Sequence, residues 1–500
     1  MNGESKISEA MVQSDKTIVL ALAALSGSVN VFAADPDEGE RHPNLLFIFP
    51  DQYRVQAMGF TGEDPVLTPH LDRLASESVV CVNAVSTMPL SSPYRGMLMT
   101  GMYPHHNNVQ TNCNTYANRF GTHLREEDTT FSDVLDAAGY YCGYIGKWHL
   151  DAPEGPLART WKTAEWDTYT PPGPRRHHFR YWCSYGCHNR HMDPYYWLND
   201  AECSDTTFAR KWGPEFEADR AIEFILGEGT ASARERSKPW ALFVSMNPPH
   251  GPYSEVPERY KALYRDLPVD SLLVRPNVPD GPRGDKGRAN VRDYFACVTG
   301  VDEQIGRILE ALDASGQAPN TIVVFTADHG EMMGSHGLMQ KVVYYDESFR
   351  IPFLIRWPEV LKPDVDSLHL GVPDVMPTLL GLAGLSDRIP DCVEGSDFSR
   401  VLTGDSDERP EFALYVKPGE DLQKSNARGL RTNRYTFVMS VTLNGLSYRL
   451  YDNVVDPYQM TDLSNSRHDL VKVFSDKLLA RLEVLEDPWL QTVKSLENPD

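Results

Sequence analysis

Four uninterrupted apolar segments constrain most strongly how this chain can fold. They are residues 45–49, 140–145, 240–244 and 321–326. Such runs are typical of parallel strands, because helices cover both faces of a parallel sheet. Amphipathic helical patterns lie between them, at residues 131–138, 216–226 and 294–312, and each is followed by a glycine suited to a helix C-terminus. The alternation predicts an α/β fold with a large, doubly wound, mixed but mainly parallel sheet flanked by helices.

Polar residues follow each of these apolar segments. In a doubly wound sheet, ligands bind outside the carboxyl ends of the strands. The four segments bring five ionisable side chains to that edge: Asp51, Lys147, His149, His250 and Asp328. Taken singly, each could be a turn former, a helix cap or a solvated side chain. Together they predict a functional site at one edge of the sheet.

The segment from Ser91 to Gly101 has the features of a helix start. Pro93 suits the first turn of a helix, so Ser91 should lie just ahead of the N-terminus. The free backbone amides and the helix dipole favour an anion there. Arg95 lies in the first turn, where its guanidinium can reach the same anion. These features alone favour a capped, exposed helix start over an anion site.

The same segment resembles the signature of the type I, formylglycine-dependent sulfatases of the alkaline phosphatase superfamily. That signature has Cys or Ser, then Pro two residues later, Arg two residues after the Pro, and Thr-Gly beginning five residues after the Arg. Further segments of that family occur in the family's order: Asp51-Gln52, Gly146–His149, Pro249–Gly251, Thr326–Gly330 and Met339–Lys341. The resemblance extends from about residue 44 to about residue 341, and more loosely through residues 394–398 and 450–453.

The resemblance implies that residue 91 is oxidised to formylglycine, whose hydrated aldehyde is the nucleophile. One hydroxyl of the hydrate attacks sulfur and forms a sulfate ester. The second hydroxyl is then deprotonated, which expels sulfate and restores the aldehyde. Because residue 91 is Ser, the resemblance also implies maturation by the radical, oxygen-independent enzyme that accepts Ser as well as Cys.

A divalent cation is implied as well, held by Asp51, Gln52, Asp328 and His329 together with the modified residue 91. Two carboxylates and further oxygen ligands suit a hard cation, so Ca²⁺ is favoured. Gln52 and His329 stand where many relatives have Asp and Asn, which lowers the negative charge of the site and leaves Mg²⁺ as the alternative. The cation would polarise the ester and lower the pKa of the attacking hydroxyl.

The remaining roles that the resemblance implies are electrostatic and acid–base. Arg95 would hold the hydrate, while Lys147 and Lys341 would stabilise the charge of the sulfate. His149 would be the base that releases sulfate. His250 would be the acid that protonates the leaving alcohol, since imidazole titrates near neutral pH.

We therefore expect a sulfuric ester hydrolase that acts on a sulfated carbohydrate. One alternative is a phosphodiesterase or phosphonate monoester hydrolase of the same superfamily, because sulfate and phosphate esters share tetrahedral geometry. Another is a glycan-binding pseudo-enzyme in which Ser91 is not converted. The net charge of −22, from 48 Lys and Arg against 70 Asp and Glu, argues against nucleic acid as a partner.

Residues 1–33 have the features of a signal peptide. Lys16 precedes an apolar run at residues 17–25, and Val31–Ala33 offers small residues for cleavage. The run is shorter than the ~20 residues that a membrane span needs. We expect a periplasmic or secreted protein with no stable membrane insertion. Acidic residues before the run leave open a translation start at Met11, or an N-terminus that is not a leader.

Two domains are expected after the signal peptide: a catalytic domain at residues 42–405 and a smaller α+β subdomain at residues 411–490. Alternating patterns at residues 435–438, 441–443 and 448–451 predict antiparallel strands, and residues 470–485 a helix. The resemblance implies that this subdomain is a four-stranded antiparallel sheet with one helix.

The segment from residue 175 to residue 197 is basic and aromatic. It could bind sugar rings and further sulfates, or form a solvated loop with a small aromatic core. Cys183 and Cys187 have two histidines nearby. In an exported chain they favour a disulfide, with Cys203 as a candidate partner, or free thiols, over a zinc site.

Overall fold

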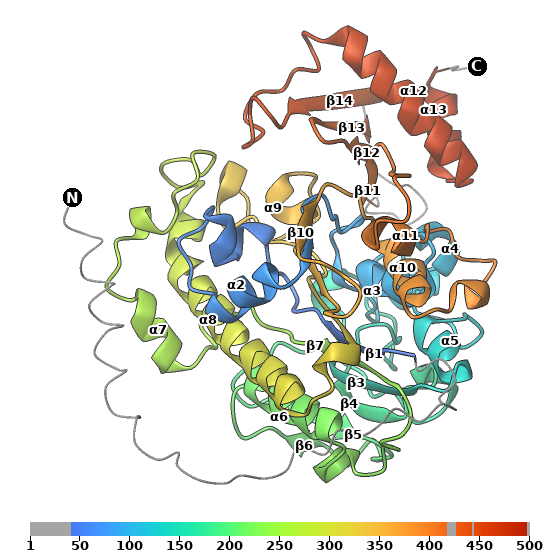
Figure 1. The fold of residues 1–500 in the computed structure, drawn as a ribbon. Helices are drawn as coiled ribbons and strands as arrows, with labels where there is room; N and C mark the ends of the chain where they lie inside the picture. Colours follow the sequence, from blue (N-terminus) through green and yellow to red (C-terminus); the bar gives the residue numbers. More distant parts are fainter. Residues whose placement is uncertain (1–41, 418–426, 443–444, 498–500) are drawn as a thin grey trace. The chain divides into compact units, whose positions relative to one another are not determined.

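The structure, a computed structural model, describes residues 42–417, 427–442 and 445–497. The predicted signal peptide at residues 1–33 lies outside these residues. The described part contains one sheet of ten strands and a second sheet of four strands (Figure 1). None of the helices in these ranges is both long enough and apolar enough to cross a membrane.

The large sheet is built around the four predicted apolar strands. In spatial order its strands are β10 (Asp364–Asp366), β2 (Val79–Cys81), β9 (Phe353–Arg356), β8 (Thr321–Thr326), β1 (Asn44–Ile48), β7 (Trp240–Ser245), β3 (Tyr141–Lys147), β4 (Tyr181–Tyr185), β5 (Tyr195–Leu198) and β6 (Thr207–Phe208). The central strands β8, β1, β7 and β3 pair in parallel. Strands β9 and β5 run antiparallel to their neighbours. The predicted fold class, a mixed and mainly parallel doubly wound sheet, is confirmed.

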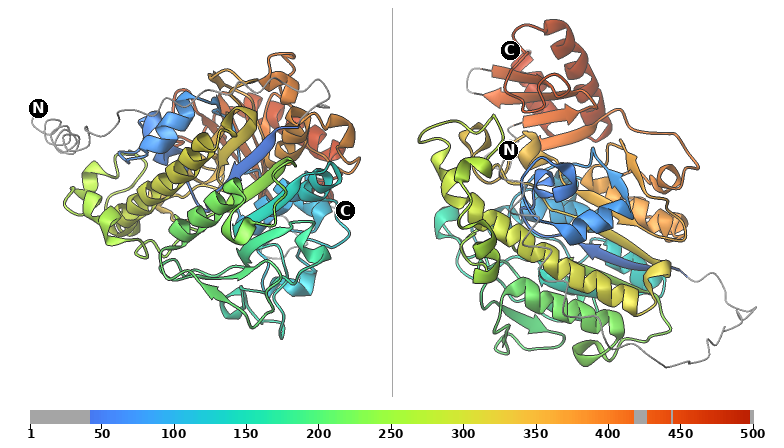
Figure 2. Two further views of the ribbon diagram at one scale, coloured as in Figure 1. Left: turned by 60° about the horizontal axis from the view of Figure 1, so that its bottom comes forward. Right: turned by 60° about the vertical axis from the view of Figure 1, so that its left-hand side comes forward.

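Helices cover both faces of this sheet (Figure 2). In one group, α2 (Pro69–Ser76), α6 (Gly213–Leu226) and α7 (Glu258–Tyr264) each contact the long helix α8 (Asp285–Ala314). A second group comprises α3 (Ser91–Thr100), α4 (Pro104–Asn107), α5 (Phe131–Ala137), α10 (Val375–Leu382) and α11 (Ser399–Leu402). The short helix α9 (Asp346–Phe349) precedes β9. The main hydrophobic core lies between these helices and the sheet.

The predicted helices end where the sequence indicated. Gly139, Gly227 and Gly316 follow α5, α6 and α8, and all three have positive φ angles, as glycines at helix C-termini do. Helix α8 begins earlier than predicted, at Asp285, because its first turns carry mainly polar residues and show no apolar stripe.

The C-terminal part has a sheet and a core of its own. Its antiparallel strands are β11 (Ala413–Lys417), β12 (Ala427–Arg431), β13 (Tyr435–Thr442) and β14 (Gly445–Asp452), and α12 (His468–Val484) and α13 (Trp489–Glu497) pack with them. The prediction of a separate strand from residue 441 was wrong for Val441 and Thr442, and residue 443 lies outside the described residues. Val441 continues β13, and its alternation belongs to one long strand. Helix α13 was not predicted.

All eight cysteines lie in the described part of the chain, and all are free thiols. The favoured disulfide involving Cys183 and Cys187 was therefore wrong, and the free-thiol alternative agrees with the structure. Both residues are buried, whereas Cys203 is exposed.

Candidate active site

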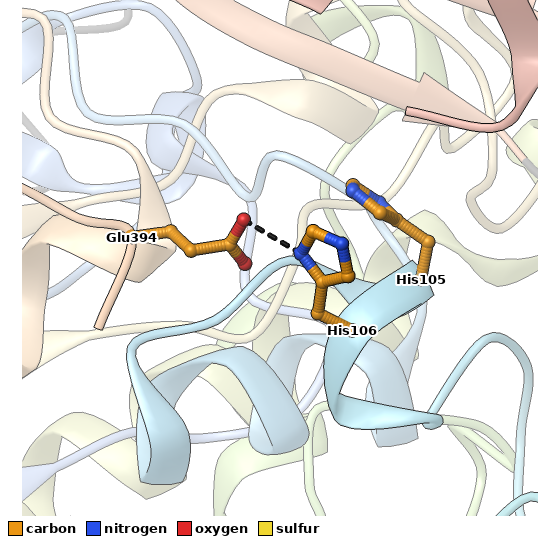
Figure 3. A group of neighbouring side chains, drawn as sticks. All are labelled: His105, His106 and Glu394. Atoms are coloured by element: carbon orange, nitrogen blue, oxygen red, sulfur yellow. Dashed lines mark hydrogen bonds and ion pairs between the residues drawn. The ribbon is translucent and has the colours of Figure 1, made fainter. Parts of the chain in front are cut away.

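Two groups of histidine and carboxylate side chains in the described residues could hold a metal ion. The first is partly exposed and consists of His105, His106 and Glu394 (Figure 3). The Glu394 carboxylate accepts hydrogen bonds from His106 Nδ1 at 2.8 Å and from the Tyr103 amide at 2.7 Å. Nε2 of His105 lies 3.0 Å from the Leu485 carbonyl. This group is already satisfied by its own contacts.

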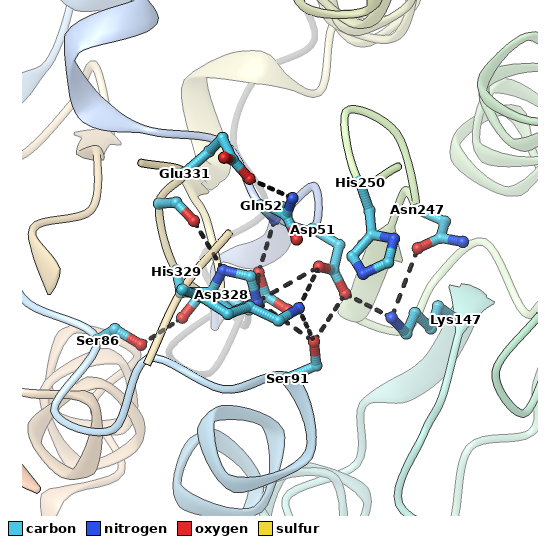
Figure 4. A network of polar contacts seen from close by, with 12 residues as sticks. Asp51, Gln52, Ser86, Ser91, Lys147, Asn247, His250, Asp328, His329 and Glu331 are labelled. Atoms are coloured by element: carbon cyan, nitrogen blue, oxygen red, sulfur yellow. Dashed lines mark hydrogen bonds and ion pairs between the residues drawn. The ribbon is translucent and has the colours of Figure 1, made fainter. Parts of the chain in front are cut away.

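The second group consists of Asp51, Asp328 and His329, and all three side chains are buried (Figure 4). Asp51 follows β1 and Asp328 follows β8, and these strands are parallel neighbours, so both carboxylates reach the same sheet edge. The sequence predicted this convergence. Gln52, with a φ angle of 66°, donates its backbone amide to Asp328 Oδ1 at 2.9 Å.

Ser91 lies at the N-terminus of α3 and faces this group. Its Oγ is 3.2 Å from Asp51 Oδ2, 3.3 Å from His329 Nε2 and 3.2 Å from Lys341 Nζ. The side chain is buried within the fold. Residue 91 is thus in contact with a carboxylate, an imidazole and an ammonium group, each from a different segment of the chain.

Arg95, one turn further along α3, is fixed from several sides. Its Nη1 donates to the Lys147 carbonyl at 2.7 Å, to Ser245 Oγ at 2.6 Å and to the Tyr144 hydroxyl at 3.2 Å. Its Nη2 lies 3.4 Å from Asp51 Oδ2. The guanidinium therefore connects α3 to the ends of β3 and β7. It also places a positive charge beside the Asp51 carboxylate.

Two lysines add positive charge beside Ser91. Lys147 Nζ donates to Asp51 Oδ2 at 2.6 Å, and Lys341 Nζ lies 3.8 Å from Asp51 Oδ1. Burial alone would lower the pKa of Lys147, but Asp51 reverses this effect and raises the pKa. For Lys341, burial prevails and lowers the pKa.

The two carboxylates respond to this environment in opposite ways. Burial disfavours the ionised form of Asp51, but Lys147 and Lys341 hold its pKa well below the usual range. Burial and repulsion from Asp51 raise the pKa of Asp328 to about 7. A cation between them would stabilise both ionised carboxylates.

His149 and His250 both line the pocket above Ser91. His149 Nε2 lies 3.2 Å from the Cys113 carbonyl and His250 Nδ1 lies 2.8 Å from the Gly251 carbonyl. Because a carbonyl can only accept, these nitrogens carry the hydrogens, and His149 Nδ1 and His250 Nε2 hold the lone pairs. Burial, followed by nearby positive charge from the lysines, lowers the pKa of both rings well below its usual value.

Three buried oxygens of the site have no hydrogen-bond donor: Asp51 Oδ1, Gln52 Oε1 and Asp328 Oδ2. His329 Nδ1 lies 2.9 Å from the Gly330 carbonyl, so its Nε2 is left as an acceptor. Unsatisfied buried acceptors are costly, and here they are the ligand types of a divalent cation. The residues present therefore fit a bound cation.

Sequence reasoning missed Glu331 and Tyr253. The Glu331 carboxylate accepts from Gln52 Nε2 at 2.5 Å and from the Tyr253 hydroxyl at 2.8 Å. It also accepts from the backbone amides of Met333 and Gln340, at 2.8 and 2.7 Å. Glu331 thereby orients the Gln52 amide and holds the loop before Lys341. An acidic residue three positions after Asp328 was the signal that the sequence offered for Glu331.

The pocket beside Ser91 has a volume of about 570 Å³. Besides the residues already described, its lining includes Asn112, Trp161, Trp166, His188, Asn189 and Gln340.

Of the basic residues at 175–180, none lines this pocket. Arg175 pairs with Asp151, and Arg180 pairs with Asp136 at 2.8 Å. These residues therefore add no sugar-binding groups to this pocket, and Arg175 and Arg180 pair with carboxylates outside the segment.

Comparison with known proteins identifies the family. A family model described as Sulfatase matches residues 43–385, which is more than half of the chain. The chain belongs to the sulfatase family. A second model, for the C-terminal part of N-sulphoglucosamine sulphohydrolase, matches residues 334–486. As a sulfatase, the protein is a sulfuric ester hydrolase, which agrees with the sequence prediction.

Relatives of this sulfatase cover nearly the whole chain. It is 40% identical to an endo-4-O-sulfatase of Bacteroides thetaiotaomicron, over 90% of this chain and 94% of the relative. It is 33% identical to an ulvan-active sulfatase of Formosa agariphila, over 89% of this chain and 82% of the relative. A solved structure from Bacteroides fragilis superposes with a TM-score of 0.85 at 42% identity, covering 92% of this chain and all of the other.

Proposed function

We propose that this sulfatase removes sulfate from a sulfated carbohydrate of the glycan or glycosaminoglycan type, with residue 91, converted to formylglycine, as its nucleophile. Its relatives include sulfatases named for action on an O-sulfate and on ulvan. The observation that carries the proposal is the position of Ser91. It lies at a buried helix N-terminus within 3.3 Å of Asp51, His329 and Lys341.

Asp51, Gln52, Asp328 and His329 would hold one divalent cation together with residue 91. Oxygen-rich coordination favours Ca²⁺ over Mg²⁺. When bound, the cation would supply Lewis-acid polarisation of the ester and lower the pKa of the attacking hydroxyl. The three donor-free oxygens of this group support the assignment.

Three cationic side chains would bind the sulfate and the nucleophile. Lys147, at the end of β3, and Lys341, in the loop before α9, would stabilise the negative charge of the sulfuryl group. Arg95 would orient residue 91, because its guanidinium is held rigidly by Ser245 and by the Lys147 carbonyl. A preorganised arrangement of this kind needs little rearrangement when the substrate binds.

The two histidines of the pocket would move the protons. His149 is neutral in the free protein, and its Nδ1 lone pair is the base that takes the proton from residue 91 when sulfate is released. His250 would donate from Nε2 to the leaving alcohol. A bound sulfate ester raises the pKa of His250 by placing negative charge beside it, which supplies the proton that this step needs.

The proposal also covers how the chain is processed and where its domains begin and end. Residues 1–33 would be a signal peptide that directs the protein to the periplasm or the exterior. Because residue 91 is Ser, a radical, oxygen-independent maturating enzyme would act on the chain. The catalytic domain would comprise residues 42–405, and the C-terminal subdomain residues 411–490.

Two measurements test this function. Mass spectrometry of the peptide that contains residue 91, from protein made in its native host, should show the loss of two hydrogens. A panel of defined sulfated saccharides, assayed for free sulfate, should include substrates, and phosphate diesters should be poorer ones. An intact serine would contradict the proposed nucleophile, and faster turnover of phosphate diesters would contradict the proposed substrate class.

A further inference from the structure

Two tryptophans from one surface segment line the pocket that contains Ser91. Trp161 begins the short 3₁₀ helix η4 (Trp161–Thr163), and 61% of its surface is exposed. Trp166 follows and is partly buried. A large aromatic side chain usually buries most of its surface, so the exposure of Trp161 at the rim of a polar pocket needs an explanation. Neither ring has a part in the chemistry at residue 91.

The segment that carries Trp166 is fixed on both sides of the ring. The Glu165 amide donates to Thr115 Oγ1 at 2.9 Å, and the Thr115 amide donates to the Glu165 carbonyl at 3.0 Å. On the other side, Asp167 accepts from the Cys187 amide at 2.8 Å. The Trp166 ring lies 6.0 Å from the ring of His149. The tryptophan is thus held beside the reacting groups before any ligand binds, which reduces the entropy that binding must overcome.

The rest of the lining complements these rings. Asn112, Asn189 and Gln340 bring amide groups to the same pocket. A sugar ring presents apolar C–H groups on its faces and hydroxyl groups at its edge. Aromatic rings bind such faces, and amides bind such hydroxyls. The volume of about 570 Å³ lies within the range of about 300–1,000 Å³ for pockets that enclose a small molecule, and is far larger than a sulfate group requires.

We propose that Trp161 and Trp166 form a subsite that binds a second sugar unit of the substrate, next to the sulfated one. This inference rests on the proposed function of the pocket. It predicts that the protein prefers a sulfated oligosaccharide to the corresponding sulfated monosaccharide, and that the preference depends on the two indole rings.

Calorimetric binding to the Ser91→Ala protein tests the subsite without turnover. The probes are sulfated glycosaminoglycan and ulvan tetrasaccharides, each paired with the sulfated monosaccharide that it contains. We expect the best tetrasaccharide to bind at least about tenfold more tightly than its monosaccharide. Adding Trp161→Ala or Trp166→Ala should remove most of this difference, whereas Trp161→Phe should keep most of it. Leu157→Ala is the matched control, because Leu157 is 57% exposed on the same segment and does not line the pocket.

Each result bears on the subsite or on the chemistry separately. Equal affinities for tetrasaccharide and monosaccharide, or a preference that survives both alanine variants, overturn the subsite. Loss of the preference in Leu157→Ala also overturns it, since the segment would then act through its fold. If the preference depends on the tryptophans but the Ser91 protein from its native host releases no sulfate, the subsite stands and the proposed hydrolysis fails.

Discussion

Two buried groups of charged side chains in this protein are built in opposite ways. At the ends of β1 and β8, Asp51 and Asp328 each keep a carboxylate oxygen without a hydrogen-bond donor. Between β12 and α9, Arg431 donates to both oxygens of Asp346, at 3.0 and 2.9 Å. The first group is open to a ligand, and the second is closed by its own partners.

This difference in hydrogen bonding separates buried charges that stabilise the fold from buried charges that can bind a ligand. A closed pair compensates the cost of burying its charges through good geometry and bidentate hydrogen bonds. The open group has an excess of unsatisfied acceptors, which only an additional positive charge can compensate. The group of His105, His106 and Glu394 resembles the closed pair in this respect, since both Glu394 oxygens have donors.

The strongest test of the open group is Asp328→Asn. The variant should contain no tightly bound divalent cation, and sulfate release should fall by more than about 10³-fold, because both Lewis-acid and electrostatic stabilisation are lost. Elemental analysis and a sulfate-release assay measure the two effects. Glu394→Gln is the matched control and should retain its metal. Metal retained by Asp328→Asn, or lost from Glu394→Gln, would reverse the assignment of the two groups.

The closed pair should matter for stability instead. Arg431→Met removes the bidentate partner of the buried Asp346 carboxylate and leaves it only Arg350 Nη1 at 3.5 Å, so it should lower the free energy of unfolding by about 3–5 kcal/mol without changing metal content. Burial opposes ionisation of Asp346, yet Arg431 lowers its folded pKa. The contribution of the pair is therefore present above the unfolded pKa of about 3.9 and is lost as the pH falls.

Denaturation at several pH values measures this effect. The difference in the free energy of unfolding between Arg431→Met and the wild-type protein should narrow below about pH 4, because protonation of Asp346 removes the ion pair from the wild-type protein and the unpaired charge from the variant. A difference that stays constant down to pH 3 would mean that the variant is destabilised through packing and not through the unpaired carboxylate.

Much of the open group could be predicted from the sequence. Each apolar run ends in a polar residue, and the parallel pairing of β1 with β8 and of β3 with β7 brings those residues to one edge. Ser91 and Arg95 were found from the local chemistry of a helix start and from the family signature. The positions of these residues along the chain were enough to predict their convergence, because the order of strands in a doubly wound sheet is restricted.

The supporting contacts could not be predicted in the same way. Glu331 joins Gln52 and the backbone amide of Gln340 through hydrogen bonds that depend on the path of a loop. The pairing of Arg431 with Asp346 joins β12 to the start of α9, which no local pattern encodes. Local hydrophobic patterns predicted β13 and α12, but they did not predict which elements pack against them.

Replacement of the proposed acid should produce an effect that depends on the leaving group. His250→Ala should lower sulfate release from a saccharide, whose leaving alkoxide is a strong base, by about 10²-fold. The loss should be much smaller for 4-nitrophenyl sulfate, whose phenolate leaves without protonation. The ratio of kcat values for the two esters measures this dependence. An equal loss for both esters would assign His250 to sulfate binding.

Exchanging the amide of Gln52 and the carboxylate of Glu331 tests whether Glu331 supports metal binding by orienting residue 52. In Glu331→Gln, the oxygen of the new amide should stay with the backbone amides of Met333 and Gln340 and turn its NH₂ group toward Gln52. Gln52 must then flip and present its own NH₂ group to the cation, which should weaken metal binding about tenfold.

The double variant Gln52→Asp with Glu331→Gln should bind the metal with an affinity within about threefold of that of the wild-type protein. In this variant the carboxylate is at residue 52, next to the cation, and the NH₂ group of the new Gln at residue 331 can donate to it. Gln52→Asp alone places two carboxylates together and should bind metal less tightly than the double variant. Calorimetric metal titration of the four proteins gives the coupling. Additive effects would show that Glu331 does not act through Gln52.

The smallest effect is expected at the pair of His106 and Glu394. The His106 side chain is 36% exposed and that of Glu394 is 16% exposed, so solvent screens their interaction. Glu394→Gln should therefore change the free energy of unfolding by less than about 1 kcal/mol, since the new amide oxygen can still accept from the Tyr103 amide. Chemical denaturation measures this change. A loss as large as that of Arg431→Met would show that this partly exposed group is as essential to the fold as the fully buried pair.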